Sequence, residues 1–166
     1  FNYYAIEGSP TIVKHLHNRF PELSDQIICG DFTVEIPFDI QFDLILDRSA
    51  VTHNNLKSIK QTLIMIKKHL KNKAPFIGID WFSKNHSESS NGFLVDDEFT
   101  RTNFTDGPFI GIGKVHFSDI SHIRELLCNF KINYLQEKIT QEFDPSIIEY
   151  DHKKNFQFAS WNFIVR

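Results

Sequence analysis

Short apolar runs alternate with amphipathic segments along the first half of the chain. Residues 3–7 form an apolar run, and Ser9-Pro10 then supplies an N-cap and a first-turn proline ahead of apolar residues at helical spacing. Apolar residues repeat every three or four positions between Asn55 and Lys71, which predicts a second amphipathic helix. The pattern predicts six strands, at residues 3–7, 26–29, 42–46, 75–80, 131–136 and 156–165.

This regularity fails in the middle of the chain. Residues 84–107 are polar, contain Gly92 and Gly107, and show no period, so we expect a lid-like loop there. A short extended stretch at 111–117 and a helix at 119–130 follow it. The last two predicted strands are joined by a polar connection that contains Asp144-Pro145.

Alternating strands and helices predict a single α/β domain, 1–166, with a mostly parallel sheet and helices on both faces. The final two strands have no helix between them, so we expect an antiparallel C-terminal pair. Ligands of such sheets bind beyond the carboxyl ends of the strands. Each of the first four predicted strands ends at or just before an acidic residue: Glu7, Asp31, Asp47 and Asp80.

Composition excludes several classes of protein. The chain has 166 residues, is 41% hydrophobic and carries a net charge of -3, which argues against nucleic-acid binding. No apolar run is long enough to cross a membrane and no signal peptide is recognised, so we expect a cytoplasmic protein. Cys29 and Cys128 are interpreted as buried thiols, and the eight histidines form no ligand pair typical of a metal site.

Four segments resemble a known family. They are Tyr4-Ala5-Ile6-Glu7-Gly8-Ser9-Pro10, Ile28-Cys29-Gly30-Asp31-Phe32, Phe42-Asp43-Leu44-Ile45-Leu46-Asp47-Arg48, and Lys68-His69-Leu70-Lys71 before the strand at 76–80. Their order and spacing are similar to those of the Rossmann-like (class I) S-adenosylmethionine-dependent methyltransferases, from the second strand of that fold to the last.

The resemblance implies S-adenosylmethionine as cofactor and S-adenosylhomocysteine as product. By analogy with the family, Glu7 beside Gly8 binds the two ribose hydroxyls. The resemblance likewise assigns the adenine amino group to Asp31 and the face of the ring to Phe32. Asp47 and Arg48 match the turn beside the methionine part of the cofactor, although they also have the charges to pair with each other.

The chain departs from the family in two places. It has no counterpart of the first strand and its glycine-rich cofactor turn, which belong to the centre of the sheet, so we expect unpaired strand edges unless other residues fill that slot. The proline-glycine-glycine turn before the fifth strand of the family is replaced by Asn72-Lys73-Ala74-Pro75, where Asn72 tolerates the left-handed conformation.

Methyl transfer to a hydroxyl needs a base, and histidine is the usual choice. His53 is the candidate base, or a residue that positions the acceptor, and Asp80 is a candidate acceptor contact. Their alternative roles are a helix-start histidine and a strand-end cap. Trp81 with Phe82 either lines the acceptor pocket or belongs to the core. Three further candidate substrate contacts lie in or beside the lid-like loop: His86, Arg101 and His116.

We therefore predict an enzyme that methylates a small molecule, on oxygen before nitrogen or sulfur. The segment 47–53 together with 79–83 is similar to a group of bacterial small-molecule methyltransferases, which favours a small acceptor. We expect a monomer or homodimer with no nucleic-acid or membrane partner. The alternatives are a methyltransferase-like binding or regulatory module without catalysis, and a nucleotide-binding domain of another Rossmann type, which the antiparallel ending disfavours.

The ribose assignment predicts that Glu7→Ala weakens S-adenosylhomocysteine binding. Charge-assisted hydrogen bonds contribute about 1.5–3 kcal/mol, which corresponds to a roughly 10- to 100-fold increase in Kd. Isothermal titration of the two proteins checks this, and an unchanged Kd in the variant would remove Glu7 from the cofactor site.

Overall fold

A computed structural model of the chain describes residues 1–141 and 156–166. Its contacts divide the chain into two compact units, Phe1–Ile40 and Gln41–Arg166, and each is described by itself. The prediction of a single domain stays a prediction. The sequence-predicted connection around Asp144-Pro145 lies outside the described residues.

The first unit is a strand–helix–strand unit. Its elements are β1 (Ala5–Glu7), α1 (Pro10–Arg19), the 3-10 turn η1 (Pro21–Leu23) and β2 (Ile27–Cys29). Ser9 caps α1, as predicted, by accepting a hydrogen bond from the Ile12 amide at 3.4 Å. β1 and β2 pair in parallel with Glu7 opposite Cys29, so both strands end at the same edge.

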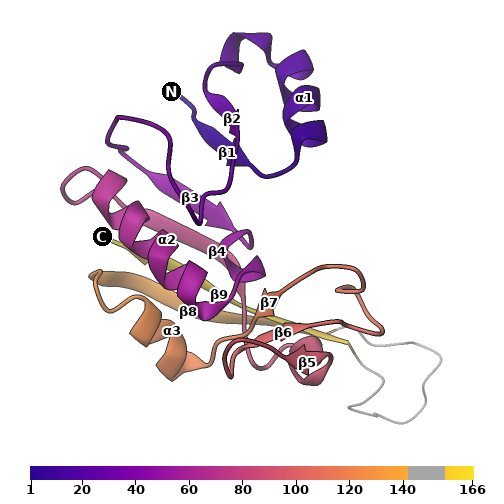
Figure 1. Cartoon of the computed structure of the whole chain (residues 1–166). Helices are drawn as coiled ribbons and strands as arrows, with labels where there is room; N and C mark the ends of the chain where they lie inside the picture. Colours follow the sequence, from indigo (N-terminus) through magenta and orange to yellow (C-terminus); the bar gives the residue numbers. More distant parts are fainter. Residues whose placement is uncertain (142–155) are drawn as a thin grey trace. The chain divides into compact units, whose positions relative to one another are not determined.

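The second unit is built on a four-stranded sheet, with α2 and α3 packed on it (Figure 1). The strand order is β3-β4-β9-β8, in which β3 and β4 are parallel and the other two pairs are antiparallel. This mixed α/β architecture and the antiparallel C-terminal pair confirm the predicted fold class. The elements are β3 (Ile45–Arg48), η2 (Val51–His53), α2 (Leu56–His69), β4 (Phe76–Phe82), η3 (Ser87–Ser90), β5 (Phe93–Leu94), β6 (Thr100–Thr102), β7 (Val115–His116), α3 (Ile120–Leu126), β8 (Ile132–Gln141) and β9 (Gln157–Val165).

The core of this unit lies between the helices and the sheet. α2 buries the stripe that the sequence predicts, through Ile59, Leu63 and Ile66. From the sheet, Phe76 is fully buried and packs edge-on against Phe163 at a ring separation of 5.4 Å. The helix is capped by Asn55, whose side chain accepts the Ser58 amide at 3.0 Å.

β3 is an open edge of the four-stranded sheet. Among the residues that the structure describes, β3 pairs only with β4. Leu44 beside it and Leu46 within it are 49% and 59% exposed, which is unusual for residues of an α/β sheet.

The segment predicted as an irregular lid contains regular structure. η3, β5 and β6 fall within 84–107, and β7 completes a three-stranded antiparallel sheet of order β5-β6-β7. This sheet covers its own apolar cluster of Phe82, Phe104, Phe109, Val115 and Phe117. Strands of two or three residues are too short to give a recognisable period, so the sequence did not indicate them, and the lid-like character of 84–107 stays a prediction.

Three predictions need correction. β3 begins at Ile45 and includes Asp47 and Arg48, so Asp47 does not follow the strand. β4 continues to Phe82 through an irregularity between Gly78 and Trp81, so Asp80 lies within the strand. Cys29 and Cys128 are exposed and not buried; Cys29 is the last residue of β2, and Cys128 lies in the turn after α3.

No helix among the described residues combines the length and apolar character needed to span a bilayer.

Close packing of Phe163 on Gly78 predicts a test of the sheet. The two residues pair across β4 and β9, and a Cβ on Gly78 would overlap the Phe163 ring. We expect Gly78→Ala to lower the free energy of unfolding by about 1–3 kcal/mol, as overpacking does. Urea unfolding followed by tryptophan fluorescence reports on this unit, because it contains both tryptophans.

The control is Gly113→Ala, where an added Cβ meets no atom within 4 Å. We expect that variant to change stability by less than about 0.5 kcal/mol. Equal effects of the two substitutions would contradict the packing of Phe163 on Gly78.

Candidate functional site

The first unit brings its predicted cofactor residues to one edge. Glu7 ends β1, and Asp31 follows β2 by two residues at the same end of the parallel pair. Glu7 Oε1 accepts the Ser9 amide at 2.8 Å, whereas Oε2 has no partner among the described residues. Asp31 is exposed and accepts the Thr33 amide at 2.8 Å. Gly8 is exposed, and Phe32 is half-buried.

In the second unit, the buried side chain of Asp47 connects β3 to β4 and to the turn that follows β3. This side chain accepts the Trp81 indole N–H at 2.7 Å and the Val51 amide at 3.2 Å. Burial raises the pKa of Asp47 to about 6, although these hydrogen bonds lower it in part. Because the native state therefore holds this proton more tightly than the unfolded chain, stability falls as the pH rises from 3.8 to about 6.

Arg48 pairs with Asp80 and not with Asp47. Arg48 Nε lies 3.3 Å from Asp80 Oδ2, and the two side chains are 76% and 16% exposed. An exposed pair of this kind adds little stability. The ion pair matters for the geometry of the site, because it holds Asp80, the predicted acceptor contact, beside the end of β3.

Asp80 is fixed by residues that sequence reasoning missed. Ser160 Oγ donates to Asp80 Oδ1 at 3.3 Å, and the Asp80 amide donates to Asn162 Oδ1 at 2.9 Å. Ser49 Oγ donates to the Asp80 carbonyl at 3.0 Å. Ser160 and Asn162 come from β9, about eighty residues along the chain, and no local pattern links them to Asp80.

Two neighbouring residues of this site have strained backbone conformations. Ser49 and Asp80 have φ of 60° and 55°, in the left-handed region that favours glycine. Such residues cost on the order of 1 kcal/mol or more and cluster at functional sites. The ends of β3 and the irregular part of β4 therefore form the best-supported candidate site of this unit.

His53, the predicted base, ends the 3-10 turn η2 that follows β3. Its Nδ1 lies 3.3 Å from the Lys114 backbone oxygen, which only accepts hydrogen bonds, so Nδ1 carries the proton. Nε2 is then unprotonated and has no partner among the described residues. Burial lowers the pKa of His53, and the Lys114 bond offsets this in part, so the ring is neutral near pH 7.

The other predicted acceptor contacts are mostly interior. Trp81 and Phe82 are 1% and 5% exposed, so both belong to the core. His86 is buried among phenylalanines, and this burial lowers its pKa to about 4. His116 is also buried, and half-buried Arg101 donates to the backbone carbonyls of Asn91 and Gly92. Substrate contact by these three lid residues stays a prediction.

No group of three metal-ligating side chains is arranged to hold an ion within residues 1–141 and 156–166. A shallow groove of about 430 Å³ runs along α2 past Asn55, Lys60 and Asp97. None of the predicted site residues lines that groove.

Solved structures resemble the chain in their fold. No protein-family model and no curated protein matches it. A S-adenosylmethionine-dependent methyltransferase from Clostridium acetobutylicum aligns with 98% of this chain and 74% of its own, at 16% identity and a TM-score of 0.63. A SAM-dependent methyltransferase from Methanosarcina mazei aligns over 98% and 81%, at 16% identity and a TM-score of 0.67.

The chain has the fold of the Rossmann-like SAM-dependent methyltransferases. The glycopeptide N-methyltransferase MtfA, in complex with S-adenosylhomocysteine, is a further structure with this methyltransferase fold, at 12% identity and a TM-score of 0.60 over 99% of this chain and 73% of its own. At identities this low, the likeness in structure shows the fold alone. The chemistry has to be argued from this chain's own residues.

Titration of Asp47 gives a direct test of the site geometry. We expect the Trp81 indole N–H resonance to move downfield with a midpoint near pH 6, because its acceptor becomes a carboxylate there. The Trp161 indole is the internal control, since it donates to the Ser118 backbone carbonyl at 2.8 Å. A Trp81 resonance that stays constant from pH 4.5 to 7.5 would exclude a raised Asp47 pKa.

Proposed function

We propose that this protein transfers a methyl group from S-adenosylmethionine to a small-molecule acceptor, with a hydroxyl oxygen as the target atom. The observation that carries the proposal is the fold, which matches SAM-dependent methyltransferases over nearly the whole chain. MtfA, one of these neighbours, is known with S-adenosylhomocysteine and with S-adenosylmethionine bound.

The residues of the first unit fit a nucleoside. Glu7 keeps one carboxylate oxygen unpaired among the described residues, and Asp31 is exposed at the same strand edge. Carboxylates accept hydrogen bonds from hydroxyl and amino groups, which are the polar groups of adenosine. Gly8 beside them leaves open space, because a Cβ there would meet only the Gly30 oxygen at 4.0 Å.

The cofactor, when bound, supplies an electrophilic methyl group on a sulfonium. The protein must orient the acceptor and take its proton. In our proposal His53 is the base, because its Nε2 is unprotonated while Nδ1–H is held by the Lys114 carbonyl. Asp80, held by Arg48 and Ser160, positions the acceptor. His53 Nε2 would take the hydroxyl proton; the cofactor, when bound, would supply the methyl group, with cleavage of its S–CH3 bond and release of S-adenosylhomocysteine.

A thermal-shift titration with S-adenosylhomocysteine tests the cofactor. A ligand at about a hundred times its Kd stabilises the folded state by about 2.7 kcal/mol. For a chain of this size the Tm should rise by about 5 °C or more. No rise would contradict cofactor binding by this chain and would leave the reading as a methyltransferase-like module without catalysis.

His53→Gln separates catalysis from binding. We expect methyl transfer from S-adenosylmethionine to a panel of small hydroxyl, amine and thiol compounds to fall by about 10²–10⁴-fold, as loss of a general base does. The Tm rise with S-adenosylhomocysteine should not change. The control is His15→Gln, at an exposed position on α1 of the first unit. Equal activity of the two variants would exclude His53 as the base.

A further inference from the structure

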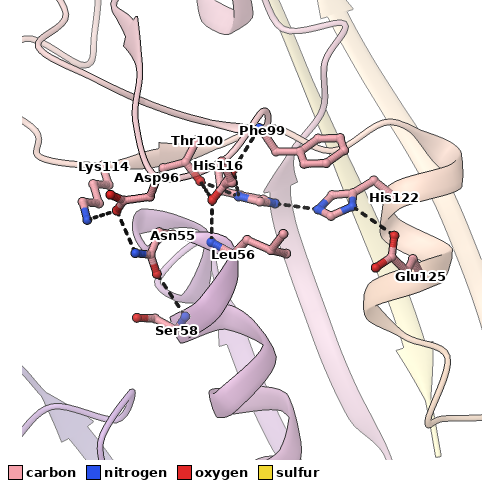
Figure 2. A network of polar contacts seen from close by, with 11 residues as sticks. Asn55, Leu56, Ser58, Asp96, Phe99, Thr100, Lys114, His116, His122 and Glu125 are labelled. Carbon is pink, nitrogen blue, oxygen red and sulfur yellow. Dashed lines mark hydrogen bonds and ion pairs between the residues drawn. The ribbon is translucent and has the colours of Figure 1, made fainter.

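A chain of polar side chains runs through the interior of the second unit (Figure 2). Asp97 and Thr100 come from the β5–β6 connection and β6, His116 from β7, and His122 and Glu125 from α3. Thr100, His116 and His122 are at most 3% exposed. We call the His116–His122 pair, whose Nε2 atoms lie 2.9 Å apart, the histidine clasp.

The hydrogen-bond partners fix where each proton sits. Thr100 Oγ1 lies 2.8 Å from Asp97 Oδ2 and 2.9 Å from His116 Nδ1. A carboxylate only accepts, so Thr100 donates to Asp97 and accepts from His116 Nδ1–H. Neutral His116 then has an unprotonated Nε2, and the proton in the clasp belongs to His122 Nε2. A single hydrogen bond, from His122 Nε2–H to His116 Nε2, therefore joins the two rings of the clasp.

The clasp tolerates one added proton but not two. His122 Nδ1 has no hydrogen-bond partner among the described residues and lies 3.8 Å from Glu125 Oε2, so a first proton there leaves the clasp intact. A second proton must go to His116 Nε2. It would set two N–H groups and two positive charges against each other, and the bond would break.

Charged side chains from several elements lie near the clasp. Asp97 Oδ1 lies 3.9 Å from His116 Nδ1, and Glu125 is paired with Lys60 of α2. Asp119 caps α3 through the His122 amide and pairs with Lys84. Lys84 also lies over the Phe99 ring, which stacks on His122 at 3.5 Å.

These surroundings oppose protonation of the clasp. Burial, together with repulsion from His122, lowers the pKa of His116 to about 3, against the attraction of Asp97. Burial also lowers the pKa of His122, which Glu125 and Asp119 offset in part. Because the unfolded chain binds these protons more readily than the native state, the clasp loses stability as the pH falls from 6.5 toward 3.

The clasp is connected to the proposed base through β7. Lys114, which precedes β7, accepts the His53 Nδ1–H with its backbone oxygen and pairs through Nζ with Asp96. Asp96 in turn accepts the Asn55 side-chain N–H at 2.8 Å, and Asp97 accepts the Leu56 amide at 2.8 Å. The connection before β6 is thus hydrogen-bonded to the start of α2 through Asp96 and Asn55 (Figure 2), and Lys114, which pairs with Asp96, also accepts the His53 Nδ1–H.

We propose that the histidine clasp is a positioning device for His53: with a single N–H between its rings it holds β7 and the Lys114 carbonyl in place, and double protonation releases both. In this proposal His116 and His122 act on catalysis through the Lys114 carbonyl and are positioning residues. The importance of His53 for methyl transfer rests on the proposed function, whereas the opening of the clasp does not.

Long-range ¹H–¹⁵N NMR of the full chain with ¹⁵N-labelled histidine tests the proton arrangement. At pH 7.5 we expect Nδ1–H tautomers for His53 and His116 and an Nε2–H tautomer for His122. On acidification the His53 Nδ1–H should lose its hydrogen bond to the Lys114 carbonyl at the same pH at which the Val115 and His116 amides lose their protection, measured against their intrinsic exchange rates at that pH. An Nε2–H tautomer of His116 at pH 7.5 would overturn the proposal.

Two substitutions of His122 distinguish the effect of its Nε2–H donor from the effect of its packing on Phe99. His122→Gln keeps a donor at the Nε2 position and can turn to accept, so the β7 amides should stay protected, and His53 Nδ1–H should keep its hydrogen bond to Lys114, to a lower pH than in the wild type. His122→Phe can keep the stacking on Phe99 but removes the donor, so β7 amides should exchange about tenfold faster or more already at pH 7.5.

His69→Gln, at the last residue of α2, is the matched control and should behave as the wild type. Opening of His122→Gln at the wild-type pH, or wild-type exchange in His122→Phe, would overturn the proposal. Absence of a Tm rise with S-adenosylhomocysteine would instead contradict the proposed function and leave these NMR results standing.

Discussion

The hydrogen bond from the Trp81 indole to Asp47 organises the second unit. It joins the end of β3 to the irregular part of β4 inside the core, where neither group finds water. The other oxygen of Asp47 accepts the Val51 amide and so starts the turn that ends at His53. Since a buried carboxylate left without donors is costly, the turn and the strand are held together. The position of His53 follows from this bond.

Elements that bury one face were predictable from the sequence. α2 shows this best, because Ile59, Leu63 and Ile66 lie on the stripe that its period marks. Strand ends were harder to predict. β4 runs past Asp80 because β9 supplies both the pairing partner and the Asn162 oxygen that accepts the Asp80 amide. A partner so distant in sequence leaves no trace in the local pattern of apolar residues.

The part of the acids and of His53 in a site stays a prediction, and the contacts between these residues could not be predicted. Glu7 ends β1 and Asp31 follows β2, whereas Asp47 and Asp80 lie within β3 and β4. The pairing of Arg48 with Asp80, and the role of Ser160, depend on backbone irregularities at Ser49 and Asp80 that no composition reveals. The β5–β7 sheet escaped prediction because its strands have at most three residues.

The pairing of β4 with β9 has a consequence for the order of events during synthesis. The edge of β4 that carries Phe76 and Trp81 is completed by β9, which opposes them with Val165 and Trp161. A ribosome adding about 5–20 residues per second needs several seconds to make the intervening chain. Through that interval Phe76 and Trp81 lack the β9 residues that oppose them in the folded sheet, so the edge of β4 is completed only after β9 has been made.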